Sequence, residues 1–283
     1  MLVIAIGLGA AFFLGLGFVI QQHAAAQAPT DERLSIRILI DLAHRPVWLA
    51  GIAAMVGGQM LGGFALGKGS LTLVEPLLTC NILFALPMAA AWHRRHLSLR
   101  EWAGSLILIG GLSGFVAAAG PGGRLASRVL PSGWLEAGLS IIFVVGVLTW
   151  FAKRSGLGQE ATLLAAGAGV LFGLQDGLTQ RILLLFDYGW LHVVFSWEPY
   201  ALVAVAVTGL VLAQSAFEAA PLTASLPALT IAEPVCGIGL GAGLFGEHIR
   251  LGGLFLGFEV AAIVLMVVGV VMVARSPLVC GEV

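Results

Sequence analysis

The chain has 283 residues, of which 59% are hydrophobic and 10% charged, with 39 glycines and a formal net charge of −1. This composition excludes a disordered segment, a collagen-like fibre and an ordinary soluble domain. The net charge says nothing about partners, and no basic stripe indicates nucleic acid as a partner. Apolar runs of about 20 residues, long enough to cross a hydrocarbon core of ~30 Å, recur along the chain. The sequence therefore predicts an all-α polytopic membrane protein.

About nine transmembrane helices are expected, at residues 2–21, 46–66, 70–91, 102–119, 134–152, 161–186, 190–213, 219–245 and 251–274. The first run has no basic residue before it and is too long for the core of a signal peptide, so it is retained as a helix. A short amphipathic piece near residues 34–42 predicts a helix on the membrane surface. The expected units are a first four-helix repeat (1–119), a linker with the fifth helix (120–160), and a second four-helix repeat with a short tail (161–283).

The distribution of basic residues predicts the orientation of the chain. If the N-terminus lies outside, inner loops hold Arg33, Arg37, Arg45, Arg94, Arg95, Arg100, Lys153, Arg154 and Arg275, whereas outer loops hold Lys68, Arg124, Arg128 and Arg250. We therefore expect a plasma-membrane protein with its N-terminus outside and its C-terminus inside. Six tryptophans at the predicted helix ends resemble an aromatic belt: Trp48, Trp92, Trp102, Trp134, Trp150 and Trp190.

An internal repeat relates the two halves of the chain. Leu71, Thr72, Pro76, Leu78 and Thr79 coincide with Leu222, Thr223, Pro227, Leu229 and Thr230 at a constant shift of 151 residues. The end of the first helix, 13–22, also aligns with residues 171–180 of the sixth. Because a single helix links the two sets, the second set runs in the opposite sense. An inverted 4+1+4 repeat of this kind is typical of secondary carriers, the alternative being chance similarity between apolar helices.

Glycine pairs four residues apart predict close helix contacts at Gly58/Gly62, Gly63/Gly67, Gly237/Gly241 and Gly253/Gly257.

Acidic residues inside the predicted helices are the main candidates for a site. They are Glu75, Asp176, Glu198, Glu233 and Glu259, and from the rise per residue they lie about 8 to 18 Å from the outer helix ends. Intramembrane acids are costly and usually face a cavity or a partner. Glu233 and Asp176 are the deepest, and they are the expected metal ligands.

Neutral groups and prolines complete the candidate set. Gln175, Gln59 and Gln214 join the acids as substrate- or cation-binding residues. Pro76, Pro199, Pro227 and Pro234 are expected helix breaks, whose freed carbonyls can coordinate cations. In the alternative interpretations, the acids carry protons, or one acid pairs with Arg181 while the others bond locally.

Several short motifs resemble a known family: R-P-V-W-L-A-G (Arg45–Gly51), Gly58-Gln59, Phe64-Ala65, V-E-P-L (Val74–Leu77), Gln214, Pro227 and Gly246-Glu247. The chain resembles the drug/metabolite transporter superfamily, and more closely its NIPA-type magnesium transporters than the ten-helix EamA-like carriers. The resemblance implies inverted repeats and cation transport. Gln59 departs from an often acidic position of that branch, Trp92-His93-Arg94 replaces its usual Glu, and Asp176 stands where a lysine is common.

The expected function is that of a secondary carrier for a cation such as Mg²⁺. The alternative is a proton-coupled carrier or exporter of a small organic metabolite or drug, for which Trp197, Phe172 and Tyr200 would provide an aromatic wall. A third class is a non-transporting membrane subunit. No enzyme activity or cofactor is expected, since no phosphate-binding loop, zinc-spaced pair or nucleophile elbow is found. The expected partners are a divalent cation or small solute and the lipid bilayer, with a homodimer left open.

Overall fold

The computed structural model describes residues 2–27, 34–66, 74, 77–92, 94, 96–119, 131–186, 188–244 and 253–274, and these residues contain helices and no strand. The helices are α1 (Leu2–Ala25), α2 (Ile36–Ala43), α3 (Pro46–Leu66), α5 (Asn81–Trp92), α6 (Leu99–Ala119), α7 (Pro131–Ala152), α8 (Leu157–Phe186), α9 (Trp190–Phe195), α10 (Glu198–Ala219), α11 (Leu222–Leu244) and α12 (Gly253–Ala274). Most expected helices are therefore confirmed to within a few residues. Their number as membrane spans stays a prediction.

The helix expected at residues 190–213 is two helices, α9 and α10, separated at Ser196 and Trp197. Proline has no N–H to donate and therefore fits the first turn of a helix. Pro199 occupies that turn, so Glu198 and Pro199 begin α10 rather than interrupting a longer helix. The prediction of a single helix over residues 190–213 was wrong, and the helix break expected at Pro199 is found just before it, between Phe195 and Glu198.

The other prolines behave differently. Pro227 and Pro234 lie inside α11, which continues as a helix through both positions. The helix breaks expected at these two prolines are therefore not found. In the first half, a turn at Cys80 precedes α5, whose first residue is Asn81. Pro76, the expected break on that side, lies outside the described residues.

The amphipathic segment is confirmed as the helix α2. The side chain of Ser35 caps its N-terminus by accepting a hydrogen bond from the backbone N–H of Arg37. One face of α2 carries the buried Ile38 and Leu42, and the opposite face exposes Ile36 and Ile40.

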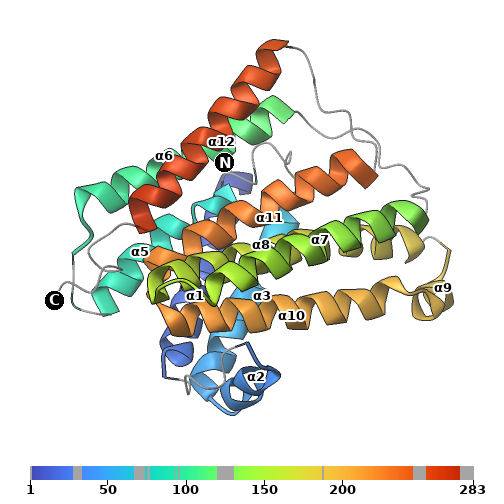
Figure 1. Ribbon diagram of the computed structural model, residues 1–283, viewed down its shortest axis with the longest axis horizontal. Helices are drawn as coiled ribbons and strands as arrows, with labels where there is room; N and C mark the ends of the chain where they lie inside the picture. Colours follow the sequence, from blue (N-terminus) through green and yellow to red (C-terminus); the bar gives the residue numbers. More distant parts are fainter. Residues whose placement is uncertain are drawn as a thin grey trace.

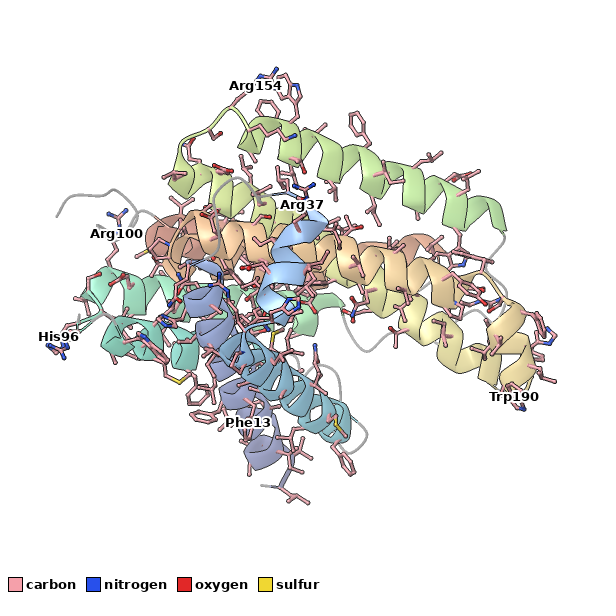
Figure 2. The ribbon with its side chains drawn as sticks, turned by 90° about the horizontal axis from the view of Figure 1, so that it is seen from below. Phe13, Arg37, His96, Arg100, Arg154 and Trp190 are labelled. Carbon is pink, nitrogen blue, oxygen red and sulfur yellow. The ribbon has the colours of Figure 1, made fainter. Side chains whose placement is uncertain are left out.

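Four long helices, α7, α8, α10 and α11, run side by side, and α1 and α3 cross this layer steeply (Figures 1 and 2). Arg154 and Trp190 mark opposite ends of the layer, and Phe13 lies on the outside of α1 (Figure 2). The helices α6 and α12 form a separate pair beside it (Figure 1). The central element is α11, which contacts α8, α12, α5, α7, α1, α10 and α6.

Glycines allow the closest helix approaches. On α8, a Cβ at Gly169 would lie 2.5 Å from the Leu229 carbonyl oxygen, and a Cβ at Gly173 would lie 2.5 Å from the Glu233 carbonyl oxygen. On α3, the predicted contact at Gly58 is confirmed, because a Cβ there would meet Leu14 at 2.8 Å.

The remaining predicted glycine contacts have mixed outcomes. A Cβ at Gly62 would lie 3.2 Å from Leu78, so this contact is also confirmed. A Cβ at Gly63, Gly237 or Gly257 would meet nothing within 4 Å. At these three positions the close helix contact predicted from the glycine spacing was wrong.

The exterior of the helices is strongly apolar. Among the described residues, five helices are long and apolar enough to cross a membrane: Leu2–Ala25, Pro46–Ala65, Gly133–Ala152, Leu157–Thr179 and Glu198–Ala219. Their outer faces carry large exposed side chains, including Phe64 at 65% and Phe143 at 72% exposure. A soluble protein rarely exposes so much contiguous apolar surface. The chain is therefore an all-α protein embedded in a membrane.

Candidate functional site

The first polar centre is an ion pair between α8 and α10. The Nε of Arg181 lies 3.3 Å from Oε1 of Glu198, and the two side chains are 20% and 5% exposed. Glu198 reaches this position because it is the first residue of α10, where the chain returns from α9 toward the end of α8. One of the five predicted acids thus pairs with Arg181, as one of the alternative interpretations expected.

Two aromatic rings meet at the start of α10, next to the residue that forms the pair. Trp197, beside Glu198 in sequence, makes an edge-to-face contact with Trp134 of α7 at a ring-centroid distance of 5.7 Å. The second carboxylate oxygen of Glu198, Oε2, is buried and has no hydrogen-bond partner among the described residues. Burying a charge without a partner is costly, and the ion pair with Arg181 offsets this cost for the Glu198 carboxylate.

The second centre lies where α8 packs on α11. Gly173 brings the two backbones together at Glu233, and Asp176 follows Gly173 by less than one helical turn. Asp176 is exposed and Glu233 is half-buried. The two expected metal ligands therefore belong to one helix–helix contact.

The third centre is a buried amide network that joins the two halves of the chain. Gln214 of α10 is fully buried; its Oε1 accepts a hydrogen bond from Nε1 of Trp48 at 3.1 Å. Its Nε2 donates to Oε1 of Gln21, at the end of α1. The amide of Gln21 in turn contacts the sulfur of Met55. Every polar group of Gln214 thus has an intramolecular partner.

This network corrects the expectation for Trp48. Trp48 was expected in an aromatic belt, but it is only 6% exposed and belongs to the core. Its indole N–H donates a hydrogen bond to the buried Gln214. In the structure the side chain of Gln214 joins α1, α3 and α10, and its expected role in binding substrate or cation stays a prediction. Gln21 was missed, and the only available signal was its place at the end of the first apolar run.

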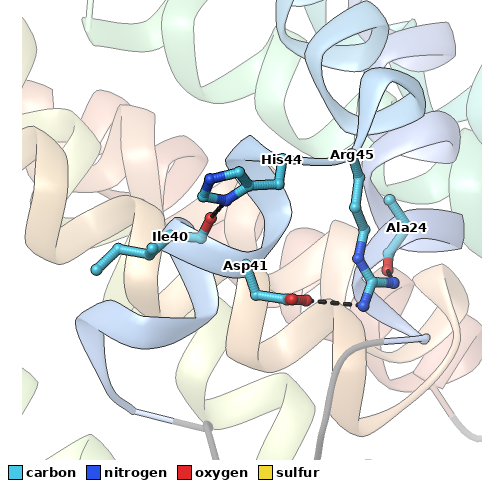
Figure 3. A network of polar contacts seen from close by, with 5 residues as sticks. All are labelled: Ala24, Ile40, Asp41, His44 and Arg45. Atoms are coloured by element: carbon cyan, nitrogen blue, oxygen red, sulfur yellow. Dashed lines mark hydrogen bonds and ion pairs between the residues drawn. The ribbon is translucent and has the colours of Figure 1, made fainter.

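A peripheral network anchors α2 (Figure 3). Arg45 bridges Asp41 at 2.7 Å and donates to the carbonyl of Ala24 at 3.3 Å, while Nδ1 of His44 lies 2.6 Å from the Ile40 carbonyl. Asp41 and Arg45 are partly exposed, so this pair contributes little stability by itself. It fixes the direction in which the chain leaves α1 and enters α3.

The remaining predicted residues do not join these centres. Gln59 is exposed on α3, and Gln175 is half-buried on α8. Glu75 and the side chain of Glu259 lie outside the described residues. Within the described residues, no three His, Cys, Asp or Glu side chains come together as a metal site. The metal-binding role of Glu233 and Asp176 stays a prediction.

The fold and these centres define an all-helical membrane protein with polar groups between its helices. No protein-family model matches the chain, and no solved structure matches it. An uncharacterized protein of Corynebacterium glutamicum is 28% identical over 261 residues, which cover 89% of this chain and 87% of that relative. The similarity thus extends over nearly the full length of both proteins.

Proposed function

We propose that the chain is a secondary carrier of the drug/metabolite transporter type, built from an inverted repeat and working by alternating access. The observation that carries this proposal is a set of helix contacts that recurs in both halves. Leu14 of α1 packs on Gly58 of α3, and Phe172 of α8 packs on Gly209 of α10, each with a Cβ distance of 2.8 Å. Gly58 and Gly209 are separated by 151 residues, the shift found in the sequence.

The second recurring contact involves the glycine that follows each of these apolar residues. A Cβ at Gly15 would lie 2.7 Å from the Asn81 carbonyl oxygen of α5, and one at Gly173 would lie 2.5 Å from the Glu233 carbonyl oxygen of α11. Asn81 and Glu233 are 152 residues apart, so this contact matches the shift of 151 to within one residue. Two contacts that recur this closely are difficult to obtain by chance similarity. They support an evolutionary repeat, and inverted repeats are the framework of many carriers.

Helix directions support the inverted arrangement. Along α6 and α12 the contacts run in opposite order, since Gly104 meets Gly269 and Gly111 meets Ala262. These two helices are the last of the proposed repeats, the fourth and the ninth in chain order, and helices five places apart in an alternating series of spans are antiparallel. The plasma-membrane location, with the N-terminus outside and the C-terminus inside, is part of this proposal.

The proposed substrate is a divalent cation such as Mg²⁺, held by Asp176 and Glu233 between α8 and α11. Hard cations prefer oxygen ligands, and Mg²⁺ keeps several waters, so two carboxylates are a sufficient protein contribution. Glu198 is removed from the cation-binding set because Arg181 already neutralises it.

A saturable uptake assay tests this function. The purified chain is reconstituted in liposomes that contain a magnesium-sensitive dye, and Glu233→Gln and Asp176→Asn are compared with Glu136→Gln, an exposed acid on α7. We expect uptake to saturate, to be lost in the first two variants and to be kept in the third. The absence of uptake by a folded preparation would contradict the cation proposal.

The second candidate is a proton-coupled carrier of a small organic solute. The observation that favours it is the buried Arg181–Glu198 pair beside Trp197 and Trp134, since an ionic group with an aromatic wall suits an organic ion. Of the other expected wall residues, Phe172 is used in helix packing, and the hydroxyl of Tyr200 donates to the Val194 carbonyl. In the liposome assay this candidate predicts no magnesium uptake, but acidification of the lumen with solute exchange.

A further inference from the structure

The first half of α11 is enclosed on all sides, because every residue from 222 to 230 is buried. It nevertheless carries three hydroxyl groups, Thr223, Ser225 and Thr230, whose oxygens have no hydrogen-bond partner among the described residues. Leaving a buried hydroxyl unpaired costs about 1–3 kcal/mol, so each of these groups needs an explanation. Thr230 is the most informative of them.

Thr230 carries a second oxygen that lacks its usual partner. In a helix, its carbonyl would accept a hydrogen bond from the N–H of residue 234, but residue 234 is proline and has none. The carbonyl and hydroxyl oxygens of one buried residue are therefore both left without a helical donor. Glu233 lies one turn further along the same face and adds a negative field.

A corresponding irregularity occurs in the first half, at the repeat counterpart of Thr230, which is Thr79. The N–H of Leu83 donates to the Cys80 carbonyl at 2.9 Å, a spacing of three residues where a regular α-helix has four. Beside this turn, Oδ1 of Asn81 is buried and has no partner among the described residues. The helix that carries it, α5, also contacts α11.

We propose that Thr230 of α11 and Asn81 of α5 supply neutral oxygen ligands to a monovalent metal cation of the sodium class. Carbonyl and hydroxyl oxygens can replace the hydration shell of a singly charged ion, as unwound carbonyls do in carriers. A dehydrated divalent ion would need more negative charge than these groups provide. The role of this ion as the coupling ion rests on the proposed carrier function, but its binding does not.

The test measures thermal unfolding of the purified full chain in detergent. Sodium chloride is titrated against choline chloride at constant ionic strength, with potassium chloride and magnesium chloride in parallel. A cation that binds the folded state raises the unfolding temperature in a saturable manner. We expect this rise with Na⁺, and a half-saturating concentration about tenfold higher in Thr230→Val and in Asn81→Leu, which corresponds to the loss of one ligand.

The matched control is Thr208→Val on α10. Thr208 is exposed and its hydroxyl already donates to the Ala204 carbonyl, so its Na⁺ response should equal that of the original chain. Thr230→Ser keeps the hydroxyl and should keep the response, which covers the case in which Thr230→Val does not fold.

Three results would overturn the inference. The first is that Na⁺ does not raise the unfolding temperature of the original chain. The second is that Asn81→Leu has the same half-saturating Na⁺ concentration as the original chain. The third is that Mg²⁺, and not Na⁺, raises the unfolding temperature and that Thr230→Val removes this rise. Magnesium uptake without a Na⁺ response contradicts this inference alone. A Na⁺ response without magnesium uptake contradicts only the proposed cargo.

Discussion

Replacing Gly173 by alanine should weaken the contact between α8 and α11, and the size of the effect follows from the geometry. The added Cβ would lie 2.5 Å from the Glu233 carbonyl oxygen, about 0.9 Å short of ordinary contact at 3.4 Å. The obstacle is backbone, so no side chain can rotate away and the two helices must separate. Overpacking of this kind costs about 1–3 kcal/mol.

The control for this prediction is Gly146→Ala on α7. A Cβ at Gly146 meets nothing within 4 Å, so this variant has the helix-propensity gain of alanine, about 1 kcal/mol, without a clash. Because both variants share that gain, the difference between them measures the clash alone. For a chain of this size, about 2–4 °C of unfolding temperature corresponds to 1 kcal/mol.

The assay is thermal unfolding of both purified variants in the same detergent. Gly173→Ala should unfold several degrees below Gly146→Ala. Gly15→Ala, at the equivalent position of the other half, should show a similar deficit, because its Cβ would lie 2.7 Å from the Asn81 carbonyl oxygen. Equal unfolding temperatures for all three variants would refute the close approach of these helices and with it the structural argument for the repeat.

Three further predictions concern the polar centres. Arg181→Met should destabilise the chain by about 3 kcal/mol, because it leaves the Glu198 carboxylate buried and unpaired. In a double-mutant cycle of unfolding midpoints, adding Glu198→Gln should restore most of that loss, and additive losses would contradict the pairing. Gln214→Leu should cost about 1–3 kcal/mol in the same assay, since it leaves the Trp48 indole N–H buried without an acceptor, and an unchanged midpoint would argue against the amide network. Ser35→Ala should remove about 1 kcal/mol from α2 through loss of its N-cap, visible as faster hydrogen exchange in that helix, and unchanged exchange would show that the cap is not needed.

The helices could be predicted from the sequence because length and apolarity are local properties. Residues 134–152 were expected as a helix and α7 is observed at Pro131–Ala152, and the amphipathic piece near residues 34–42 is α2. A run of about 20 apolar residues satisfies its own backbone hydrogen bonds in any surroundings, so its helical state does not depend on its neighbours. The failures concern prolines: α10 begins at Glu198 and Pro199, and α11 continues through Pro227 and Pro234, because a proline can interrupt a helix, begin one or lie within one.

The candidate site could be predicted only as a set of residues. Depth along a helix placed Glu198 near the membrane centre together with the other acids, whereas in the structure it begins α10 and pairs with Arg181, 17 residues earlier. The partner of an acid depends on which helix faces meet. Helix rotation and crossing are set by contacts such as those of Gly169 and Gly173, which no single-helix pattern reveals.

By itself, then, the sequence determined a helical membrane protein, the approximate bounds of its helices and the acids worth testing. Only the tertiary structure decided that Gln214 closes a network with Gln21, 193 residues away, and that Trp48 is buried there. It also decided that Thr230 is enclosed while its hydroxyl has no hydrogen-bond partner among the described residues. The physical reason is that a buried polar group is stabilised or left unpaired by whichever distant helix packs against it, and that choice depends on the whole arrangement.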